Sequence, residues 1–460
     1  MTARAAVVGA GPSGFYAADQ LLKASVAVDL YDALPTPYGL VRAGVAPDHP
    51  KIKSVTRMYE KTAQHPSFRF FGGVEVGVDV TPEDLLERYH AVVYAVGTPT
   101  DNRLDVPGDG RPGSVAATEF VAWYNGHPSH ADAAFDLSCE RAVVVGNGNV
   151  AIDVARMLVL DPDELAGTDT ADHAIAAFAA ASVTDVVILG RRGPAQAAFT
   201  NPELRELGEL ARADVVVDPS EVELDPASAA WLESGDASPT THRNIAMLRE
   251  LADREPAGRS HRIELRFCRS PIEVLGDGAD GPVTGLRVAR NRLEPGPRGV
   301  RAVVTGEQEV IPCGLVIRSI GHRGRPLPGV PFDERRGLIR NAGGRVCEED
   351  GTPRVGEYAV GWIKRGPSGV IGTNKKCAAD TVAGLLDDLP RGRLADLPEG
   401  GGDAVEPWLR ARVAGLVTWS GWQAIDEHER ARGADAGRPR VKLVRVPEML
   451  AVADQLRLSA

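Results

Sequence analysis

Paired cysteines are missing from this chain. Its five cysteines are scattered, and none of them form a CxxC or CxxxxC motif. Enzymes that reduce disulfides use two neighbouring cysteines, and iron–sulfur clusters need a set of cysteine ligands. Both chemistries are therefore excluded within this chain. We expect each cysteine to be a small buried residue, and we expect no metal site.

Long apolar runs and an excess of positive charge are also missing. Apolar stretches are interrupted within about ten residues, too short to span a membrane, and no apolar segment follows a basic start. The formal net charge is −11, which opposes general binding to nucleic acid. We therefore expect a cytoplasmic protein without membrane insertion. With 460 residues, the chain is long enough for two or three domains.

Glycine is abundant and occurs in a dinucleotide-binding pattern near the N-terminus. The motif Gly9-Ala-Gly11-Pro-Ser-Gly14 follows an apolar run and opens a helical stretch. Such glycines allow a tight turn, a close approach to pyrophosphate and close packing of helix on strand. The next strand, expected at 26–31, ends at Asp32. A carboxylate there suits a free ribose 2′-hydroxyl, as in FAD or NAD, and disfavours NADP.

A second motif repeats this pattern with the opposite charge. Gly146-Asn-Gly148-Asn-Val-Ala151 follows the apolar run 142–145, and the next expected strand leads into Arg191 and Arg192. Paired guanidiniums suit the 2′-phosphate of NADP(H). A solvated surface pair is the alternative interpretation. The long gap between the motif and the arginines indicates an inserted helical segment at 161–182.

The fold class predicted from these motifs is α/β with two Rossmann-like dinucleotide-binding domains. Apolar runs at 92–96 and 315–320 end in Gly97 and Gly321 and suggest crossings between domains. We expect an NADP-binding domain at 101–324, inserted in a discontinuous FAD-binding domain formed by 1–100 and 325–460. Strand-like runs between 273 and 305 predict an antiparallel meander within the inserted domain.

The segment from Tyr358 to Lys376 is expected to run from a strand through a glycine loop into a helix. A helix N-terminus after Gly369 would stabilise the negative charge of a reduced flavin. Trp362 could lie against the isoalloxazine ring. An ordinary tight loop is the alternative.

These residues resemble the adrenodoxin reductase type of ferredoxin:NADP reductase over nearly the whole chain. The motifs that carry the resemblance are Pro37-Tyr-Gly-Leu40-Val-Arg42, Gly44-Val-Ala-Pro-Asp48-His49-Pro50, Gly146 to Arg156, Gly190-Arg-Arg-Gly-Pro194 with Ala197 to Thr200, Gly361 to Lys376, and Gly437 to Lys442. One departure is Asn102, which stands where the family has arginine. The resemblance leaves Arg103 in doubt as an NADP contact.

The resemblance implies site residues by matching position. Contacts to FAD are expected from Ser13, Asp32, Leu40, Val76, Trp362, Gly369, Val370 and Ile371. Contacts to NADP are expected from Asn147, Gly148, Asn149, Val150, Arg191, Arg192, Glu203 and Gly369. His49 and Glu206 are the catalytic candidates, placed near the nicotinamide and flavin to handle a proton or orient the hydride donor. A turn-capping role is the alternative for His49.

The function implied is an FAD-dependent NADPH:ferredoxin oxidoreductase. Hydride would pass from NADPH to FAD, and single electrons would then pass to a separate ferredoxin, such as one that supplies a cytochrome P450. Flavin monooxygenase or quinone reductase activity is one alternative, and a flavoprotein without turnover is another. A basic face for an acidic ferredoxin is expected from Arg243, Arg249, Arg254, Arg259, Arg262, Arg266 and Arg269, with a solvated helix face as the alternative.

Overall fold

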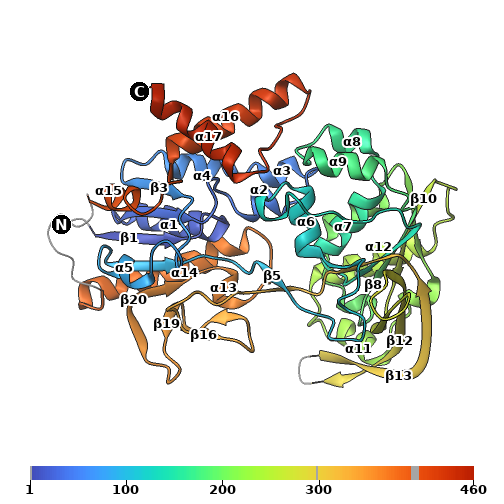
Figure 1. Ribbon diagram of the computed structural model, residues 1–460. Coiled ribbons are helices and arrows are strands. Elements are labelled where there is room, and N and C mark those ends of the chain that lie inside the picture. Colours follow the sequence, from blue (N-terminus) through green and yellow to red (C-terminus); the bar gives the residue numbers. More distant parts are fainter. Residues whose placement is uncertain (1–2, 297–298, 395–403, 460) are drawn as a thin grey trace. The chain divides into compact units, whose positions relative to one another are not determined.

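The structure of the chain is a computed structural model that describes residues 3–296, 299–394 and 404–459. The chain forms two compact units, each with strands in sheets and flanking helices (Figure 1). Unit 1 comprises Met1–Thr100, Asn125–Ala131 and His322–Ala460, and unit 2 comprises Asp101–Tyr124 and Asp132–Gly321. In the part of the chain that the structure describes, no helix is long and apolar enough to cross a membrane.

Unit 1 is built on an eight-stranded sheet with the order β18-β19-β20-β4-β1-β2-β3-β21. Neighbours from β20 to β3 are parallel. These strands are β20 (Pro353–Ala359), β4 (Ala91–Tyr94), β1 (Arg4–Val8), β2 (Ala27–Asp32) and β3 (Phe68–Gly72). The carboxyl ends of parallel strands share one edge of a sheet, which is where ligands bind in open α/β folds. Asp32 is the last residue of such a strand, and Gly9, Gly97 and Gly361 follow within three residues of one.

The apolar run of β1 is buried on both sides of this sheet. Ala5 and Val7 belong to one core cluster, and Ala6 and Val8 belong to the other. Side chains alternate between the faces of a strand, so a continuous apolar run suits a parallel strand covered on both faces. Helix α1 (Pro12–Lys23) connects β1 to β2, and α14 (Thr373–Asp388) packs against α1.

Unit 2 contains a six-stranded parallel sheet with the order β6-β14-β7-β8-β10-β9. Its strands are β6 (Ser114–Ala116), β14 (Leu315–Arg318), β7 (Arg141–Val145), β8 (Asp185–Leu189), β10 (His261–Arg266) and β9 (Ala213–Val217). The second glycine motif connects β7 to α7 (Asn149–Val159). The expected insertion forms α8 (Pro162–Ala166) and α9 (Asp172–Ala179). The prediction of two Rossmann-like units is therefore confirmed.

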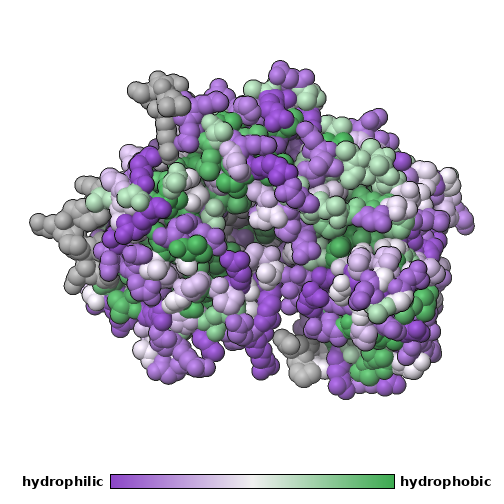
Figure 2. Space-filling model, viewed as in Figure 1, coloured by the Kyte–Doolittle hydropathy of each residue, from purple (hydrophilic) through white to green (hydrophobic). Residues whose placement is uncertain are grey.

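The predicted antiparallel meander is also present. It consists of β11 (Arg269–Gly276), β12 (Val283–Gly296) and β13 (Gly299–Pro312). On the face drawn in Figure 2, hydrophobic residues occur in small groups separated by hydrophilic ones. Such scattered apolar groups are normal for a surface that faces water.

Candidate dinucleotide sites

The first glycine turn is closed by tight backbone contacts. Gly9 has a φ of +108°, and a Cβ there would lie 2.6 Å from the carbonyl oxygen of Ala95. A Cβ at Gly14 would lie 2.0 Å from the carbonyl oxygen of Gly9. At Gly11, by contrast, the nearest heavy atom to a Cβ would be 4.0 Å away. Gly9 and Gly14 thus close the turn, whereas a Cβ on Gly11 would only reach van der Waals contact with Gly39.

Asp32 lies at the end of β2 and holds this turn. Its carboxylate accepts the N–H of Ala10 at 2.8 Å and the N–H of Leu34 at 2.9 Å. Burial raises the pKa of the Asp32 carboxyl to about 6, although both hydrogen bonds favour the charged form. Ribose hydroxyls that donate to this carboxylate would add to that stabilisation.

Two buried polar atoms near the carboxyl edge of the same sheet have no hydrogen-bond partner among the residues that the structure describes. They are the indole Nε1 of Trp362 and the hydroxyl Oγ1 of Thr98. Trp362 also packs against His322, with 5.3 Å between ring centroids. Buried polar atoms are normally hydrogen-bonded, so both donors fit a ligand that offers acceptors. The carbonyl oxygens and ring nitrogens of a flavin are such acceptors. Thr98 was missed by the sequence argument, although it follows β4 directly after Gly97.

The expected order of strand, glycine loop and helix is present, and the helix begins four residues after Gly369. Helix α14 starts at Thr373 with Gly372 as its N-cap, and a short helix, α13 (Trp362–Arg365), precedes the loop. The N–H of Val370 donates to the hydroxyl of Thr373 at 3.2 Å. Threonine hydroxyls commonly accept from nearby backbone N–H groups in turns, and Thr373 does so here for a loop N–H that precedes the helix. The exposed N–H groups expected just after Gly369 are therefore partly satisfied.

The other predicted FAD contacts in unit 1 lie on separate elements. Leu40 begins the short helix α2 (Leu40–Ala43) and is 43% exposed, whereas Val76 is buried in the core. The N–H of Tyr38 donates to Ala10 O at 2.8 Å, which places α2 next to the glycine turn. His49 is buried and occupies the N-cap position of α3 (Pro50–Lys53), but its side chain makes no capping hydrogen bond to this helix.

The second glycine turn in unit 2 is tied to the segment that follows β8. The carbonyl of Asn147 accepts the N–H of Ala198 at 3.0 Å, and the side chain of Asn149 accepts the N–H of Thr200 at 2.8 Å. Around Gly148, a Cβ would meet no heavy atom within 4 Å. The turn therefore leaves open space at the N-terminus of α7, where the helix dipole favours an anion.

Arg191 and Arg192 follow β8, and their backbone is fixed. Arg191 O accepts from the side chain of Asn291 at 2.7 Å, and Arg192 O accepts the N–H of Cys268 at 3.1 Å. Both side chains are exposed, and neither has a carboxylate partner within the described ranges. Partial desolvation and the neighbouring Arg191 charge lower the pKa of Arg192. An anion bound between the two guanidiniums would relieve this repulsion.

Helix α10 (Asn201–Gly208) carries the remaining two predicted residues. Glu203 accepts a hydrogen bond from the hydroxyl of Thr200, and Glu206 lies 3.8 Å from Arg156 of α7. Glu203 is thus linked through Thr200 to Asn149 in the second glycine turn, whereas Glu206 lies beside α7 at Arg156. His49 and Glu206, the catalytic candidates, belong to different units. Their proposed roles stay predictions.

The departure at Asn102 has a structural explanation within unit 2. Its side-chain amide donates to the carbonyls of Ile320 and Gly321 at 3.3 and 3.2 Å. Arg103 pairs with Asp109 at 3.3 Å. Asn102 thus joins the strand segments that enter and leave this unit.

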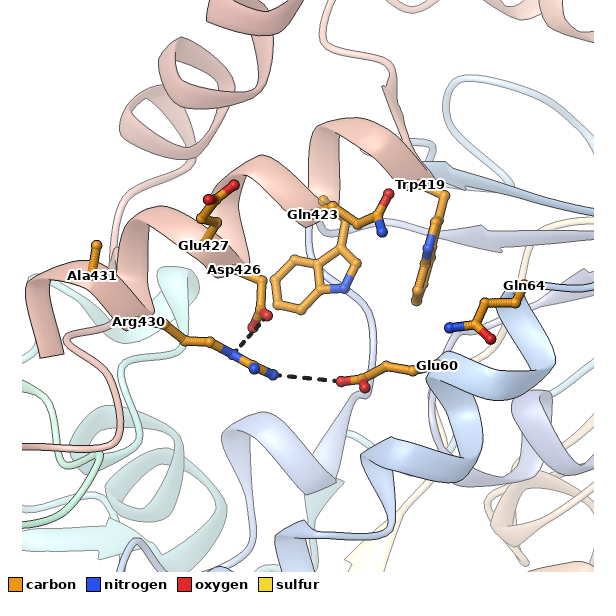
Figure 3. Close-up of a pocket in the computed structure, with 9 residues that line it drawn as sticks. Glu60, Gln64, Trp419, Gln423, Asp426, Glu427, Arg430 and Ala431 are labelled. Atoms are coloured by element: carbon orange, nitrogen blue, oxygen red, sulfur yellow. Dashed lines mark ion pairs between the residues drawn. The ribbon is translucent and has the colours of Figure 1, made fainter. Parts of the chain in front are cut away.

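A pocket of about 610 Å³ lies away from both glycine motifs in the sequence (Figure 3). It is formed by residues of α4 (Thr56–Ala63), the following Gln64 and α16 (Trp419–Asp435). Its lining residues are Glu60, Gln64, Trp419, Trp422, Gln423, Asp426, Glu427, Arg430 and Ala431. None of the predicted site residues line it.

Each unit has parallel strands at the centre of its sheet and a glycine turn after one of them, and the charges beside the two turns are opposite. These features define an oxidoreductase of the two-dinucleotide type. Residues 3–171 match the family model of the pyridine nucleotide-disulphide oxidoreductases. NADPH-ferredoxin reductase FprA of Mycobacterium tuberculosis is 51% identical, with 97% of this chain and 98% of the relative covered.

Two further comparisons indicate the same family. The mitochondrial NADPH:adrenodoxin oxidoreductase of Salvelinus fontinalis is 44% identical over 97% of this chain and 90% of the relative. The solved structure of M. tuberculosis FprA in complex with NADPH matches with a TM-score of 0.93 and 49% identity, covering 98% of this chain and 100% of that one. The chain belongs to the NADPH-ferredoxin reductase family, and the resemblance stated from its motifs is confirmed.

Proposed function

We propose that this chain transfers electrons from NADPH, through a bound FAD, to a ferredoxin. The observation that carries this proposal is the difference between the two turns: a partly buried carboxylate, Asp32, beside the first, and two exposed guanidiniums beside the second. A carboxylate repels a 2′-phosphate, whereas paired arginines attract it. The relatives named as NADPH-ferredoxin reductases support the same direction of transfer.

We assign FAD to residues 1–100 and 325–460, and NADP(H) to 101–324. In the first assignment, Gly9, Gly11 and Gly14 form the turn for the pyrophosphate, and Asp32 accepts from the adenosine ribose. The remaining proposed FAD contacts are Ser13, Leu40, Val76, Trp362 and the loop residues Gly369, Val370 and Ile371. A bound flavin takes up an electron pair and passes electrons on singly.

In the NADP(H) assignment, Arg191 and Arg192 hold the 2′-phosphate, and the N-terminus of α7 faces the pyrophosphate. The turn residues Asn147, Gly148, Asn149 and Val150 approach the ligand through their backbone, which the open space at Gly148 permits. Glu203, fixed by Thr200, is positioned beside this turn. We propose that Gly369 also contacts NADP(H).

His49 and Glu206 are proposed to orient the nicotinamide or to handle a proton. Hydride transfer to a flavin does not itself need a strong acid or base, so both roles are minor. Glu206 is suited to a role in orientation, because its carboxylate faces Arg156 at 3.8 Å.

The electron acceptor is proposed to be a separate, acidic ferredoxin, such as one serving a cytochrome P450. Most of the seven arginines expected to form its docking face are engaged within unit 2. Arg266 and Arg269 share Glu309 at 2.7 and 2.8 Å, Arg262 pairs with Glu264, and Arg259 pairs with Asp214. Arg243 and Arg249, exposed on α12 (Pro239–Ala252), are the better candidates for a transient, salt-sensitive contact.

An anaerobic titration tests this function. NADPH should bleach the flavin absorbance, NADH should do so weakly, and cytochrome c should then be reduced only when ferredoxin is added. Flavin bleaching followed by electron transfer to oxygen or quinone, independent of ferredoxin, would favour the monooxygenase or quinone reductase alternative. If NADPH bleaches the flavin absorbance but no acceptor is then reduced, the protein would be a flavoprotein without catalytic turnover.

A further inference from the structure

A strained turn lies against the first glycine motif. Tyr38 has a φ of +86° and Gly39 a φ of +48°. For an aromatic residue, such a backbone conformation is unfavourable and persists only when its surroundings hold it. A Cβ at Gly39 would lie 3.0 Å from the Cα of Gly11. The turn therefore fixes the distance between the glycine motif and the start of α2, where Leu40 is exposed.

Tyr38 packs against Phe15 of α1 and Tyr59 of α4, and a further part of its surroundings comes from helix α16 near the C-terminus. The Tyr38 ring packs edge-on against Trp422, with centroids 5.5 Å apart and an interplanar angle of 88°. On the same indole, the guanidinium of Arg42 lies 5.4 Å from the ring centroid. Both ends of the segment from Tyr38 to Arg42 thus contact a side chain far away in the sequence.

Glu429, also on α16, is fully buried and binds Arg42 through both carboxylate oxygens. Arg42 Nη1 donates to Oε2 at 2.8 Å, and Nη2 donates to Oε1 at 2.5 Å. The carboxylate also accepts from Arg440 at 3.1 Å and from the N–H of Leu443 at 2.8 Å. A two-pronged contact of this kind fixes orientation as well as distance.

Helix α16 is itself fastened to α4. Arg430 lies between Asp426, at 2.8 Å, and Glu60 of α4, at 3.6 Å (Figure 3). Asp426 is also bound by Arg440 at 2.7 Å. These ion pairs hold α16 in place, so the position of the Glu429 carboxylate on this helix is defined.

We propose that Glu429 is a positioning residue for FAD, acting through Arg42 to hold the Tyr38–Leu40 turn against the first glycine motif. Without its carboxylate, the Arg42 guanidinium, only 9% exposed, would lose its bidentate partner. The α2 segment would then move with it, and the strained turn would relax away from Gly11. This inference rests on the proposed FAD site.

The test is the FAD affinity of the apoprotein, measured by quenching of flavin fluorescence. Glu429→Gln should weaken FAD binding about tenfold or more, as expected when a charged hydrogen bond is lost. Glu427→Gln, an exposed position on the same helix, is the matched control and should bind FAD like the unaltered protein. NADPH affinity, which depends on unit 2, should be the same in all variants.

A double-mutant cycle separates positioning from general destabilisation. If Glu429 acts through Arg42, then Glu429→Gln should add little to the loss of FAD affinity caused by Arg42→Gln. Arg42→Lys keeps the charge but loses the two-pronged contact, and should give an intermediate loss even if Glu429→Gln does not fold. Unchanged FAD affinity in the folded variants, or fully additive losses, would overturn the inference. If the unaltered chain fails to bind FAD, the proposed function fails instead.

Discussion

Gly361 and Ser13 approach so closely that a Cβ on Gly361 would lie 2.0 Å from Ser13 Oγ and 2.6 Å from Ser13 Cβ. Gly361 follows β20 and has a φ of +74°, and Ser13 lies in the first turn of α1. The N–H of Gly361 also donates to the sulfur of Cys377 at 3.3 Å. Residues separated by most of the sequence therefore share one close contact at the proposed FAD site.

Gly361→Ala should disrupt this contact. The added methyl would force Ser13 or the loop to move, and overpacking of this kind costs about 1–3 kcal/mol. We expect a lower melting temperature and weaker FAD binding, measured by thermal unfolding and flavin fluorescence. Gly372→Ala is the control, because a Cβ at Gly372 meets no heavy atom within 4 Å and its φ is −61°. Equal melting temperatures and equal FAD affinities for the two variants would contradict the prediction.

Replacing Arg191 or Arg192 with alanine should remove the preference for NADPH over NADH. Each guanidinium that binds a phosphate contributes about 1.5–3 kcal/mol, so KM for NADPH should rise about tenfold or more. KM for NADH should change little, because NADH has no 2′-phosphate. Steady-state rates with ferricyanide as acceptor measure both. Arg249→Ala, exposed on α12, is the control, and an equal loss for both nucleotides would contradict the assignment.

FAD binding should weaken on acidification through Asp32. Burial raises the pKa of this carboxyl to about 6 in the protein without ligand, and ribose hydroxyls would stabilise the charged form. Protonation must therefore compete with FAD below about pH 6, and affinity should fall as the pH decreases through that value. Titration of the apoprotein with FAD from pH 5 to 8 measures this.

The Asp32 carboxyl also makes folding stability depend on pH, and this dependence runs in the opposite direction to that of FAD binding. Because the folded-state pKa of Asp32 is raised, its contribution to the stability of the apoprotein is largest below the unfolded pKa of 3.8 and is lost as pH rises through about 6. Asp32→Asn should abolish both pH dependences. Persistence of either one in this variant would assign it to another group.

His49→Gln and Glu206→Gln should each reduce kcat by less than about tenfold, within the lower range of acid–base effects. The physical reason is that hydride transfer does not require proton transfer at these side chains. Stopped-flow reduction of the flavin by NADPH measures the step directly. A loss of several hundredfold with an altered pH profile would instead make either residue a general acid or base.

The sequence predicted the chemistry that depends on local patterns. Gly9, Gly11 and Gly14 lie between an apolar run and a helical stretch, and this order predicted the first turn. The distance along the chain from each glycine motif to the end of the next strand predicted the roles of Asp32 and of Arg191 with Arg192. The fold class followed for the same reason. The helix expected after Gly369 is present, but its first residue, Thr373, and the hydrogen bond from the Val370 N–H to the Thr373 hydroxyl were not predicted.

Only the tertiary structure determined the contacts between segments that are far apart in the sequence. No pattern places Glu429 on Arg42, Trp422 on Tyr38, or Ser13 against Gly361. A turn or a strand is specified by neighbouring residues, because backbone sterics and alternating side chains act over a few positions. A buried ion pair between residues several hundred positions apart forms only when the packed sheet brings their helices together, and no local property of the sequence encodes that distance.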